Sequence, residues 1–334
     1  MRNRSLLSLE DLSTGEIDLL LDLSRHFRER GIPAARPGRF VCGLFFDPSL
    51  RTRTALEIAS VSLGAHCIVH NVGQGVWKLE TREGAVMDGD RVEHVRDAVG
   101  KFLSGVVDLI GVRSFSDLSL PYEDNREDPV LRAIAACSQV PVVNLESTQF
   151  HPLQGLADLL VLRNHLRGPP SDHAIALTWA WHPKALPMAV PNTALLAFTR
   201  AGYRVRLVHP PGFDLDPEIV ERARGYAGER LTLHDEMDDG LSGANVIYAK
   251  SWGAIQEYGS PPGPLGIRGV LRGWIVDERR QALGAPGAFM HCLPVRRNVI
   301  VTDGVIDGPH SWVAEQARSR VLTQAALLHE VLPA

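Results

Sequence analysis

Cysteine is scarce in this 334-residue chain, and its four cysteines are widely spaced with no CxxC pair. This scarcity does not support a disulfide framework or a cysteine-type zinc site, and it fits a reducing cytoplasm best. The first ten residues lack the apolar core and cleavage site of a signal peptide. No apolar run is long enough to cross a membrane. The cysteines are Cys42, Cys67, Cys137 and Cys292.

An excess of one charge is also lacking, since 35 Lys and Arg stand against 39 Asp and Glu, for a formal net charge of -4. This balance gives no electrostatic reason to expect nucleic acid or an anionic membrane as a partner. Four enzyme signatures are absent as well: GxGxxG, GxxxxGK followed by Ser or Thr, HExxH and GxSxG. Their absence weakens the dehydrogenase, kinase, metallopeptidase and hydrolase interpretations.

Short β-rich runs alternate with amphipathic helical stretches along the chain, which is 45% hydrophobic and 22% charged. This alternation predicts an α/β fold with two doubly wound parallel-sheet domains. We expect the domains at residues 1–150 and 151–310, with residues 311–334 packing back on the first as a helix. The predicted strands are Phe40–Phe46, Cys67–Val72, Val107–Val112, Val140–Leu145, Ala174–Trp179, Tyr203–Val208, Asn245–Tyr248, Trp274–Val276 and Ala288–His291.

Helix signals accompany these strands. Ser13 and Glu16 have the spacing of a capping box, and Gly31 ends the helix that follows. Further helices are predicted over Thr54–Leu63, from Pro152 to about Leu166, and over Ser311–Leu332.

The first polar motif, Ser49-Leu50-Arg51-Thr52-Arg53-Thr54, lies where a strand ends and a helix begins. Backbone N–H groups, hydroxyls and two guanidiniums converge there, at the end of a helix dipole that favours anions. One interpretation is a phosphate-binding site. The alternative is an ordinary helix cap with solvated arginines, which is common for short motifs of this kind.

Three other motifs lie at strand or helix ends. Arg113 follows a predicted strand, and His151-Pro152-Leu153-Gln154 begins a helix near the domain junction. His291-Cys292-Leu293-Pro294-Val295-Arg296-Arg297 follows a buried strand, where ligands bind in open α/β sheets. Singly, these residues would be read as a surface arginine, a satisfied cap and a buried structural thiol. Together they indicate one cleft between the two domains.

Two polar loops and two further strand ends complete the candidates. Residues 77–80 and 86–94 form a polar stretch around Trp77, which predicts a lid, a subunit contact or a plain loop with one half-buried aromatic. Residues 178–184 and 248–253 offer a histidine, lysines and aromatics to a polar, anionic or acyl-bearing ligand.

The segments Ser49–Arg53, His151–Gln154 and His291–Pro294 resemble, in order and spacing, the three signatures of the aspartate/ornithine carbamoyltransferase family. The resemblance extends along essentially the whole chain. It implies that residues 1–150 bind carbamoyl phosphate and residues 151–310 the second substrate. It also implies a homotrimer with active sites shared between subunits.

Within that family, the chain resembles the N-acylornithine carbamoyltransferases of the alternative arginine pathway. Lys250-Ser251-Trp252-Gly253 replaces the Ser-Met-Gly loop of ordinary ornithine enzymes, and the His-Pro-Leu-Pro form typical of aspartate enzymes is missing. The resemblance is carried by Trp77, the loop Met87–Asp90, Thr178-Trp179 with His182-Pro183, and Tyr248–Trp252.

Val92 bears on the acyl group of the substrate. At this position the family has Glu in acetylornithine enzymes and Pro in succinylornithine enzymes. A glutamate carboxylate here would repel the free carboxylate of a succinyl group, and Val92 carries no such charge. Pro187, the stretch Ile300–Thr302 and the five-residue step from Glu146 to His151 also resemble the succinyl branch. We therefore expect N-succinyl-L-ornithine as substrate, with N-acetyl-L-ornithine or tolerance of both as alternatives.

The resemblance implies roles for individual residues. The neutral δ-amine of the acylornithine would attack the carbamoyl carbon, with the oxyanion stabilised by Thr52, Arg113 and His151. Carbamoyl phosphate would be held by Ser49, Leu50, Arg51, Thr52, Arg53, Trp77 of a neighbouring subunit, Arg113, His151, Gln154, Cys292, Leu293 and Arg320, with Arg318 as the alternative to Arg320. The acylornithine would be bound by Val92, Glu146, His182, Pro183, Lys250 and Leu293.

Positioning alone suffices for this chemistry, because the leaving group is already activated, so we expect no metal and no organic cofactor. Arg113, His151, Gln154, Cys292 and Thr52 form the expected catalytic set. A competing hypothesis is a non-catalytic carbamoyltransferase-like protein that binds anions. The presence of the carbamoyl-orienting residues favours the enzyme.

Overall fold

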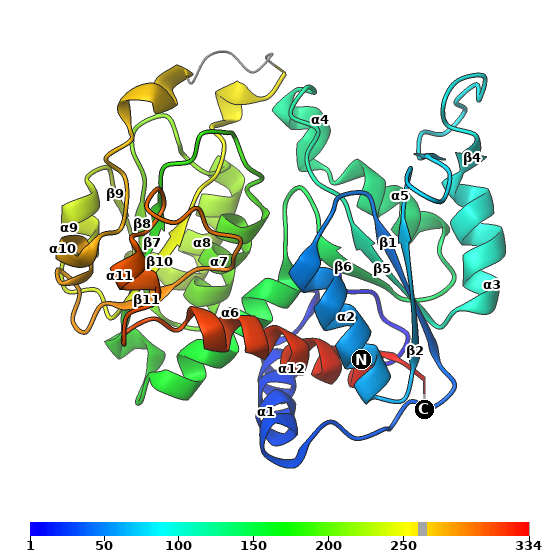
Figure 1. Ribbon diagram of the computed structural model, residues 1–334, viewed down its shortest axis with the longest axis horizontal. Coiled ribbons are helices and arrows are strands. Elements are labelled where there is room, and N and C mark those ends of the chain that lie inside the picture. The colour runs from blue at the N-terminus through cyan, green and yellow to red at the C-terminus, as the bar shows by residue number, and fades with distance from the viewer. Residues whose placement is uncertain (260–265, 334) are drawn as a thin grey trace. The chain divides into compact units, whose positions relative to one another are not determined.

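The computed structural model of the chain describes residues 1–259 and 266–333. The chain divides into two compact α/β units (Figure 1). Unit 1 comprises Met1–Ser116, Glu123–Ala157 and Ser319–Ala334, and unit 2 comprises Asp117–Tyr122 and Asp158–Arg318. Each unit has its own parallel sheet, which confirms the predicted α/β fold.

The sheet of unit 1 has the strand order β2-β1-β5-β6, and all its pairs are parallel. Its central strands read as unbroken apolar runs because helices cover both faces. Gly43 allows α2 to approach closely, since a Cβ there would lie 2.9 Å from Leu56. The strands are β1 (Phe40–Phe45), β2 (His66–Asn71), β5 (Leu109–Arg113) and β6 (Val142–Glu146); β3 (Leu79–Glu80) and β4 (Glu93–His94) form a separate small pair.

The first long helix of unit 1 has the predicted ends. Ser13 and Glu16 form the capping box, and Gly31 ends the helix at a φ of 85° that favours glycine. The helices of this unit are η1 (Leu9–Asp11), α1 (Thr14–Arg30), α2 (Leu50–Ser62), the π-helix η2 (Arg96–Leu103), α3 (Ser104–Val106), α4 (Tyr122–Arg126, whose first residue belongs to unit 2) and α5 (Pro129–Cys137).

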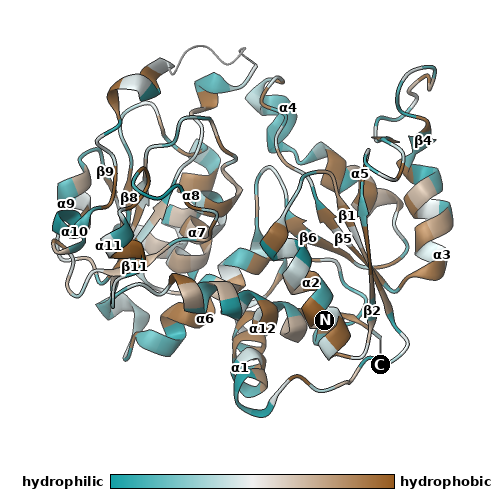
Figure 2. Cartoon of the chain, viewed as in Figure 1, coloured by the Kyte–Doolittle hydropathy of each residue, from teal (hydrophilic) through white to brown (hydrophobic). Residues whose placement is uncertain are grey.

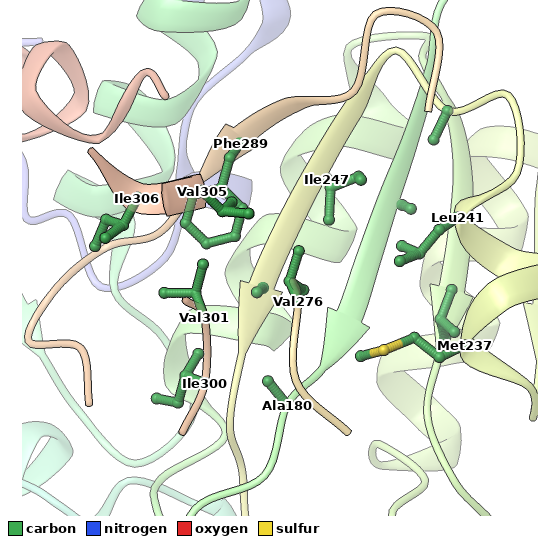
Figure 3. Close-up of a cluster of buried hydrophobic side chains, with 14 of the residues drawn as sticks. Ala180, Met237, Leu241, Ile247, Val276, Phe289, Ile300, Val301, Val305 and Ile306 are labelled. Atoms are coloured by element: carbon green, nitrogen blue, oxygen red, sulfur yellow. The ribbon is translucent and has the colours of Figure 1, made fainter. Parts of the chain in front are cut away.

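The sheet of unit 2 has the order β11-β10-β7-β8-β9 and is also parallel. On one face, buried side chains of α9 and α11 pack with Ile247 and Phe289 (Figure 3), and α7 packs on β7 and β8. The strands are β7 (Ala174–Trp179), β8 (Arg204–Val208), β9 (Leu231–His234), β10 (Val246–Lys250) and β11 (Ala288–Met290).

Short helices connect the strands of unit 2. They are η3 (Pro170–Asp172), α7 (Ala189–Arg200), α8 (Pro217–Ala227), η4 (Gly228–Arg230), α9 (Met237–Leu241), η5 (Ile255–Glu257), η6 (Gly266–Val270), α10 (Glu278–Gln281) and α11 (Asp303–Ile306). Hydrophobic residues concentrate along the strands and on one side of several helices (Figure 2). None of the helices within the described residues is long and apolar enough to span a bilayer.

Two long helices pass from one unit to the other. α6 (Pro152–His165) begins in unit 1 and ends in unit 2, and α12 (Val313–Val331) runs from unit 2 into unit 1. Ser319 is the first α12 residue counted with unit 1.

One predicted strand, Trp274–Val276, is wrong. Only Val276 pairs, in an isolated bridge with Val301, because the backbone of this segment is used in turns and Arg280 takes the carbonyl of Ile275. Strand β9 was not predicted, since it has four residues of which only Leu231 is buried, a weak signal beside the apolar runs of the central strands.

Candidate functional site

The candidate site residues of unit 1 follow three adjacent strands. The loop after β1 leads into α2, Arg113 ends β5 and Glu146 ends β6. Because parallel strands present their carboxyl ends at the same edge of a sheet, these side chains meet. Asp47 fixes the loop after β1 by accepting a hydrogen bond from the backbone N–H of Phe115 at 2.7 Å.

The Ser49–Arg53 motif forms the first turn of α2, one turn earlier than the predicted helix start. The Ser49 hydroxyl caps the helix by accepting from the Thr52 N–H at 3.2 Å. Arg51 is half-buried, and Arg53 donates to Glu57 at 3.0 Å. The Leu50 side chain is 77% exposed, so only the backbone of Leu50 faces the interior of the motif.

Thr52 is the centre of the unit 1 cluster. Its buried hydroxyl accepts from Arg320 Nη2 at 2.7 Å and lies 3.4 Å from Arg113 Nη1. Arg320 Nη2 is also 3.3 Å from His151 Nε2. Two guanidiniums thus converge on one hydroxyl at a helix N-terminus, an arrangement suited to a phosphate or another oxyanion.

The carboxylate of Glu146 contacts this cluster. Glu146 forms an ion pair with Arg113, and its Oε2 lies 3.5 Å from His151 Nε2. The Arg113 guanidinium also packs 4.3 Å from the centre of the Phe115 ring, which restricts its orientation. Glu146 therefore offsets the positive charge of Arg113 within this cluster.

Helix α6 places two more predicted residues in unit 1. His151 immediately precedes α6, and Gln154 lies in its first turn; both side chains are buried. At the other end of the chain, Arg320 is buried against Thr52, whereas Arg318 is exposed. The structure therefore brings together Thr52, Arg113, His151 and Arg320, and leaves Arg318 outside this cluster.

Trp77 and Val92 lie on the loop around β3 and β4 with their side chains exposed, by 67% and 54%. The loop is held by Glu80, which accepts from Arg82 and Arg91. Hydrogen bonds from Arg82 hold the pKa of Glu80 at about 2, so this carboxylate stays charged. Both predicted residues therefore leave apolar surface exposed on this loop.

The candidate residues of unit 2 gather at the ends of β7 and β10. Lys250 pairs with Trp179 in register, and its carbonyl accepts from the Ala180 N–H at 3.1 Å, so the segment of His182 and Pro183 continues directly from this sheet edge. His182 Nε2 lies 2.9 Å from Arg296 Nε. Burial lowers the pKa of His182 to about 4, which makes it a neutral acceptor at neutral pH.

Cys292 and Leu293 follow β11. Cys292 is buried, and Leu293 has a φ of 56°, a left-handed conformation that is uncommon for a leucine. The Leu293 N–H donates to His291 Nδ1 at 2.8 Å.

Two arginines of unit 2 were given no role from the sequence. Arg296 contacts His182, and its position just after a predicted strand end was the available signal. Arg268 is buried, forms an ion pair with Glu257 and donates to the Lys184 carbonyl at 2.8 Å. No local motif marks Arg268. The described residues contain no group of three or more His, Cys, Asp and Glu side chains arranged to hold a metal ion.

Two family models match the chain. The model for the aspartate/ornithine carbamoyltransferase carbamoyl-P binding domain covers residues 4–164, and that for the Asp/Orn binding domain covers residues 186–331. These matches, with the two parallel-sheet units, define the class of the protein as carbamoyltransferase. The chain belongs to the aspartate/ornithine carbamoyltransferase family.

Its relatives include the N-acetylornithine carbamoyltransferase of Xanthomonas campestris pv. campestris, 39% identical over 98% of this chain and 97% of the relative. The N-succinylornithine carbamoyltransferase of Bacteroides fragilis is 37% identical over 86% of each chain. A solved acetylornithine transcarbamylase complexed with acetylcitrulline superposes with a TM-score of 0.94 and 38% identity, over 99% of this chain and 100% of that one. Within the family, the chain is of the N-acylornithine type.

One further solved structure bears on the acyl group. It is a glutamate-to-valine variant of N-acetyl-L-ornithine transcarbamylase, complexed with carbamyl phosphate and N-succinyl-L-norvaline. It superposes with a TM-score of 0.93 and 38% identity, covering 98% of this chain and 100% of that one.

Proposed function

We propose that this enzyme transfers the carbamoyl group of carbamoyl phosphate to the δ-amine of N-succinyl-L-ornithine, giving N-succinyl-L-citrulline and phosphate in arginine biosynthesis. The observation that carries the proposal is the unit 1 cluster, in which Arg113 and Arg320 converge on the Thr52 hydroxyl. Such an arrangement fits an acyl phosphate, whose phosphate leaving group and developing oxyanion both need fixed donors.

The phosphate group would bind at the N-terminus of α2. Its ligands would be the hydroxyls and backbone N–H groups of the first turn and the arginines around it: Ser49, the Leu50 backbone, Arg51, Thr52, Arg53 and Arg320. Free N–H groups at a helix N-terminus favour an anion, and guanidiniums form charge-assisted hydrogen bonds with phosphate oxygens.

The carbamoyl group would be oriented by Arg113, His151, Gln154 and the carbonyls of Cys292 and Leu293. Attack by the neutral δ-amine forms the new C–N bond and a tetrahedral oxyanion, which Thr52, Arg113 and His151 stabilise as preorganised donors. Collapse of this intermediate breaks the C–O bond to phosphate, and the proton lost by the amine leaves with the phosphate product. Positioning of two reactants supplies the remaining rate enhancement.

The acylornithine would bind mainly to residues of unit 2. Lys250 would bind the α-carboxylate and Glu146 the amide, with His182, Pro183 and Leu293 lining the pocket. Arg296 adds a cation next to the neutral His182, at 2.9 Å between Nε and Nε2. We therefore add Arg296 to the carboxylate-binding residues.

Val92 supports the succinyl substrate. It provides no carboxylate that would repel a succinyl carboxylate, and a relative carrying valine in place of a glutamate was solved complexed with N-succinyl-L-norvaline. The names of the relatives favour the acetyl alternative equally, since N-acetylornithine carbamoyltransferases match with 39% identity. N-acetyl-L-ornithine is therefore the second candidate substrate.

The assembly would be a cytoplasmic homotrimer. The support is the exposed Trp77, a large aromatic side chain 67% accessible on one chain, which a neighbouring subunit would cover while Trp77 contributes to the neighbour's phosphate site.

The deciding experiment measures ureido product from carbamoyl phosphate with ornithine, N-acetylornithine and N-succinylornithine side by side. We expect a preference for the succinyl compound. A preference for the acetyl compound would keep the enzyme class and overturn the assignment from Val92. No turnover with any amine, with phosphate binding retained, would favour the non-catalytic anion-binding protein.

A further inference from the structure

Unit 2 contains a buried carboxylate for which the proposed chemistry has no use. Asp158 lies on α6, four residues after Gln154, and is 1% exposed. Its Oδ2 accepts from the Tyr248 hydroxyl at 2.9 Å, and its Oδ1 accepts from Gln316 Nε2 at 2.6 Å. Burying a carboxylate costs free energy, and hydrogen bonds such as these offset that cost.

Gln316 connects Asp158 to the residue after β11 through two hydrogen bonds. Gln316 lies on α12 and is itself 1% exposed. While its Nε2 donates to Asp158, its Oε1 accepts from the backbone N–H of His291 at 3.0 Å. The amide is therefore fixed in one orientation, because reversing it would set a donor against the His291 N–H.

His291 in turn holds the next peptide of the same segment. Its Nδ1 accepts from the Leu293 N–H at 2.8 Å, which closes a tight turn over residues 291–293. Leu293 adopts the left-handed φ of 56° within that turn. A leucine keeps such a conformation only where its surroundings impose it.

Tyr248 anchors the other end of the network from β10, the strand next to β11 in the sheet. Tyr248 is fully buried, and burial raises the pKa of its hydroxyl well above the ordinary value. The hydroxyl therefore stays protonated and donates to Asp158 throughout the range in which enzymes work. A chain of four hydrogen bonds thus joins β10, α6, α12 and the turn after β11.

We propose that Asp158 and Gln316 are positioning residues, which hold the 291–293 turn so that its carbonyls orient the carbamoyl group. This inference rests on the proposed function, in which the carbonyls of Cys292 and Leu293 contact the carbamoyl group. Neither Asp158 nor Gln316 touches substrate in this scheme. They act through the hydrogen bond between Gln316 and the His291 N–H, and a displacement of about 1 Å at such a position can cost about 100-fold in rate.

The test exchanges the acid and the amide. D158N leaves one acceptor oxygen for two donors, and Q316E sets a second carboxylate against Asp158. The double variant D158N/Q316E restores these three hydrogen bonds: the new amide donates to the new carboxylate and still accepts from Tyr248, and the carboxylate also accepts from His291. We expect kcat to fall at least ~10-fold in each single variant and to return to within about threefold of wild type in the double variant.

A second readout separates positioning from loss of stability. Inhibition by inorganic phosphate reports on the unit 1 residues, so its constant should stay unchanged in all three variants. Tyr248→Phe and Tyr122→Phe form a matched pair, since the Tyr122 hydroxyl donates to Asp216 at 2.8 Å in the same unit but outside this network. Both should lose similar thermal stability, and only Tyr248→Phe should lower kcat.

Hydrogen exchange of the His291 and Leu293 amides tests the network without any substrate. Faster exchange in each single variant and recovery in the double variant supports the inference. Unchanged exchange and kcat in the single variants, or a kcat that stays low in the double variant while both amides recover, would overturn it. If the wild type forms no ureido product, the proposed function fails, and amide exchange then decides whether Asp158 and Gln316 hold the turn.

Discussion

In unit 1 two arginines, one at the end of β5 and one on α12, are buried against the Thr52 hydroxyl, whereas in unit 2 an exposed arginine lies beside a neutral imidazole. Arg113 and Arg320 contact Thr52 from fixed directions, and both are buried. Arg296 is exposed and contacts His182. Unit 1 thus provides two buried guanidiniums and unit 2 an exposed one.

The difference matches the chemistry proposed for each unit. Charges buried in a low dielectric stabilise a developing oxyanion strongly, because they do not need to reorganise during the reaction. An exposed cation is screened by solvent and contributes less. Unit 1 is therefore suited to the reacting phosphate and carbamoyl groups, and unit 2 to holding the unreactive carboxylate of the acylornithine.

Replacing Arg113 by alanine should have the largest effect. It removes a guanidinium that contacts both Thr52 and Glu146. We expect turnover to fall by about 100-fold or more, the loss typical of one oxyanion donor, as measured by ureido-product formation. Arg39→Ala is the control, because it breaks a partly exposed ion pair with Asp108 in the same unit and should leave turnover unchanged. Wild-type turnover in Arg113→Ala would remove this residue from the catalytic set.

Arg320→Ala should come next, with Arg318→Ala as its partner on the same helix. Arg320 donates to the Thr52 hydroxyl, whereas the Arg318 side chain is exposed. Loss of a charge-assisted hydrogen bond predicts a KM for carbamoyl phosphate raised by roughly 10-fold to 100-fold in Arg320→Ala. Arg318→Ala should stay near wild type. Equal effects in steady-state kinetics would contradict the distinction between the buried and the exposed arginine.

Val92→Glu tests whether an exposed loop residue sets the acyl preference. A carboxylate there would repel the succinyl carboxylate, so the ratio of kcat/KM for succinylornithine over acetylornithine should fall by about tenfold. Val86→Glu is a matched control, since Val86 is an exposed valine of the same loop. An unchanged ratio in Val92→Glu would place the acyl pocket elsewhere.

Asp128 should affect stability alone. Burial raises its pKa to about 6 in the folded chain from an ordinary value of 3.8. Protonation therefore favours the folded state: this contribution is fully present below pH ~4 and is lost as the pH rises through ~6, by about 3 kcal/mol. Urea unfolding of Asp128→Asn against wild type should show the variant gaining relative stability from pH 4 to pH 7. A pH-independent difference would contradict this.

An aspartate of unit 2 provides the opposite case. Hydrogen bonds from Arg279 and Arg280 lower the pKa of Asp238 to about 2. Its stabilising contribution is present above pH ~4 and is lost as the pH falls towards 2. Asp238→Asn should therefore lose relative stability as the pH rises from 2 to 4, by a small amount because the pair is largely exposed.

Most strands of both sheets could be predicted from the sequence because each is an apolar run bounded by turn residues. β7 has the predicted bounds, and β1 differs by one residue. The Ser49 and His151 motifs were recognisable because their residues are consecutive. The predicted strand Trp274–Val276 was wrong because its apolar side chains pack in the core while its backbone forms turns instead of pairing along a strand.

Local signals could not reveal which distant residues meet. Arg320 contacts Thr52 across 268 positions, and Gln316 contacts Asp158 across 158. No local pattern distinguishes Arg320 from Arg318, or marks Asp158 as the acceptor for Tyr248. Only the tertiary fold, which brings α12 to α2 and to α6, creates these pairs.

By itself the sequence determined the α/β class, the helix caps and the order of the family motifs, because hydrophobic period and capping are properties of about ten consecutive residues. The tertiary structure decided which groups form hydrogen bonds with the buried side chains of Thr52, Asp158 and His182. The physical reason is that a buried polar group must find its hydrogen bonds wherever the fold brings a donor or acceptor within about 3 Å, however far away that group lies in the chain.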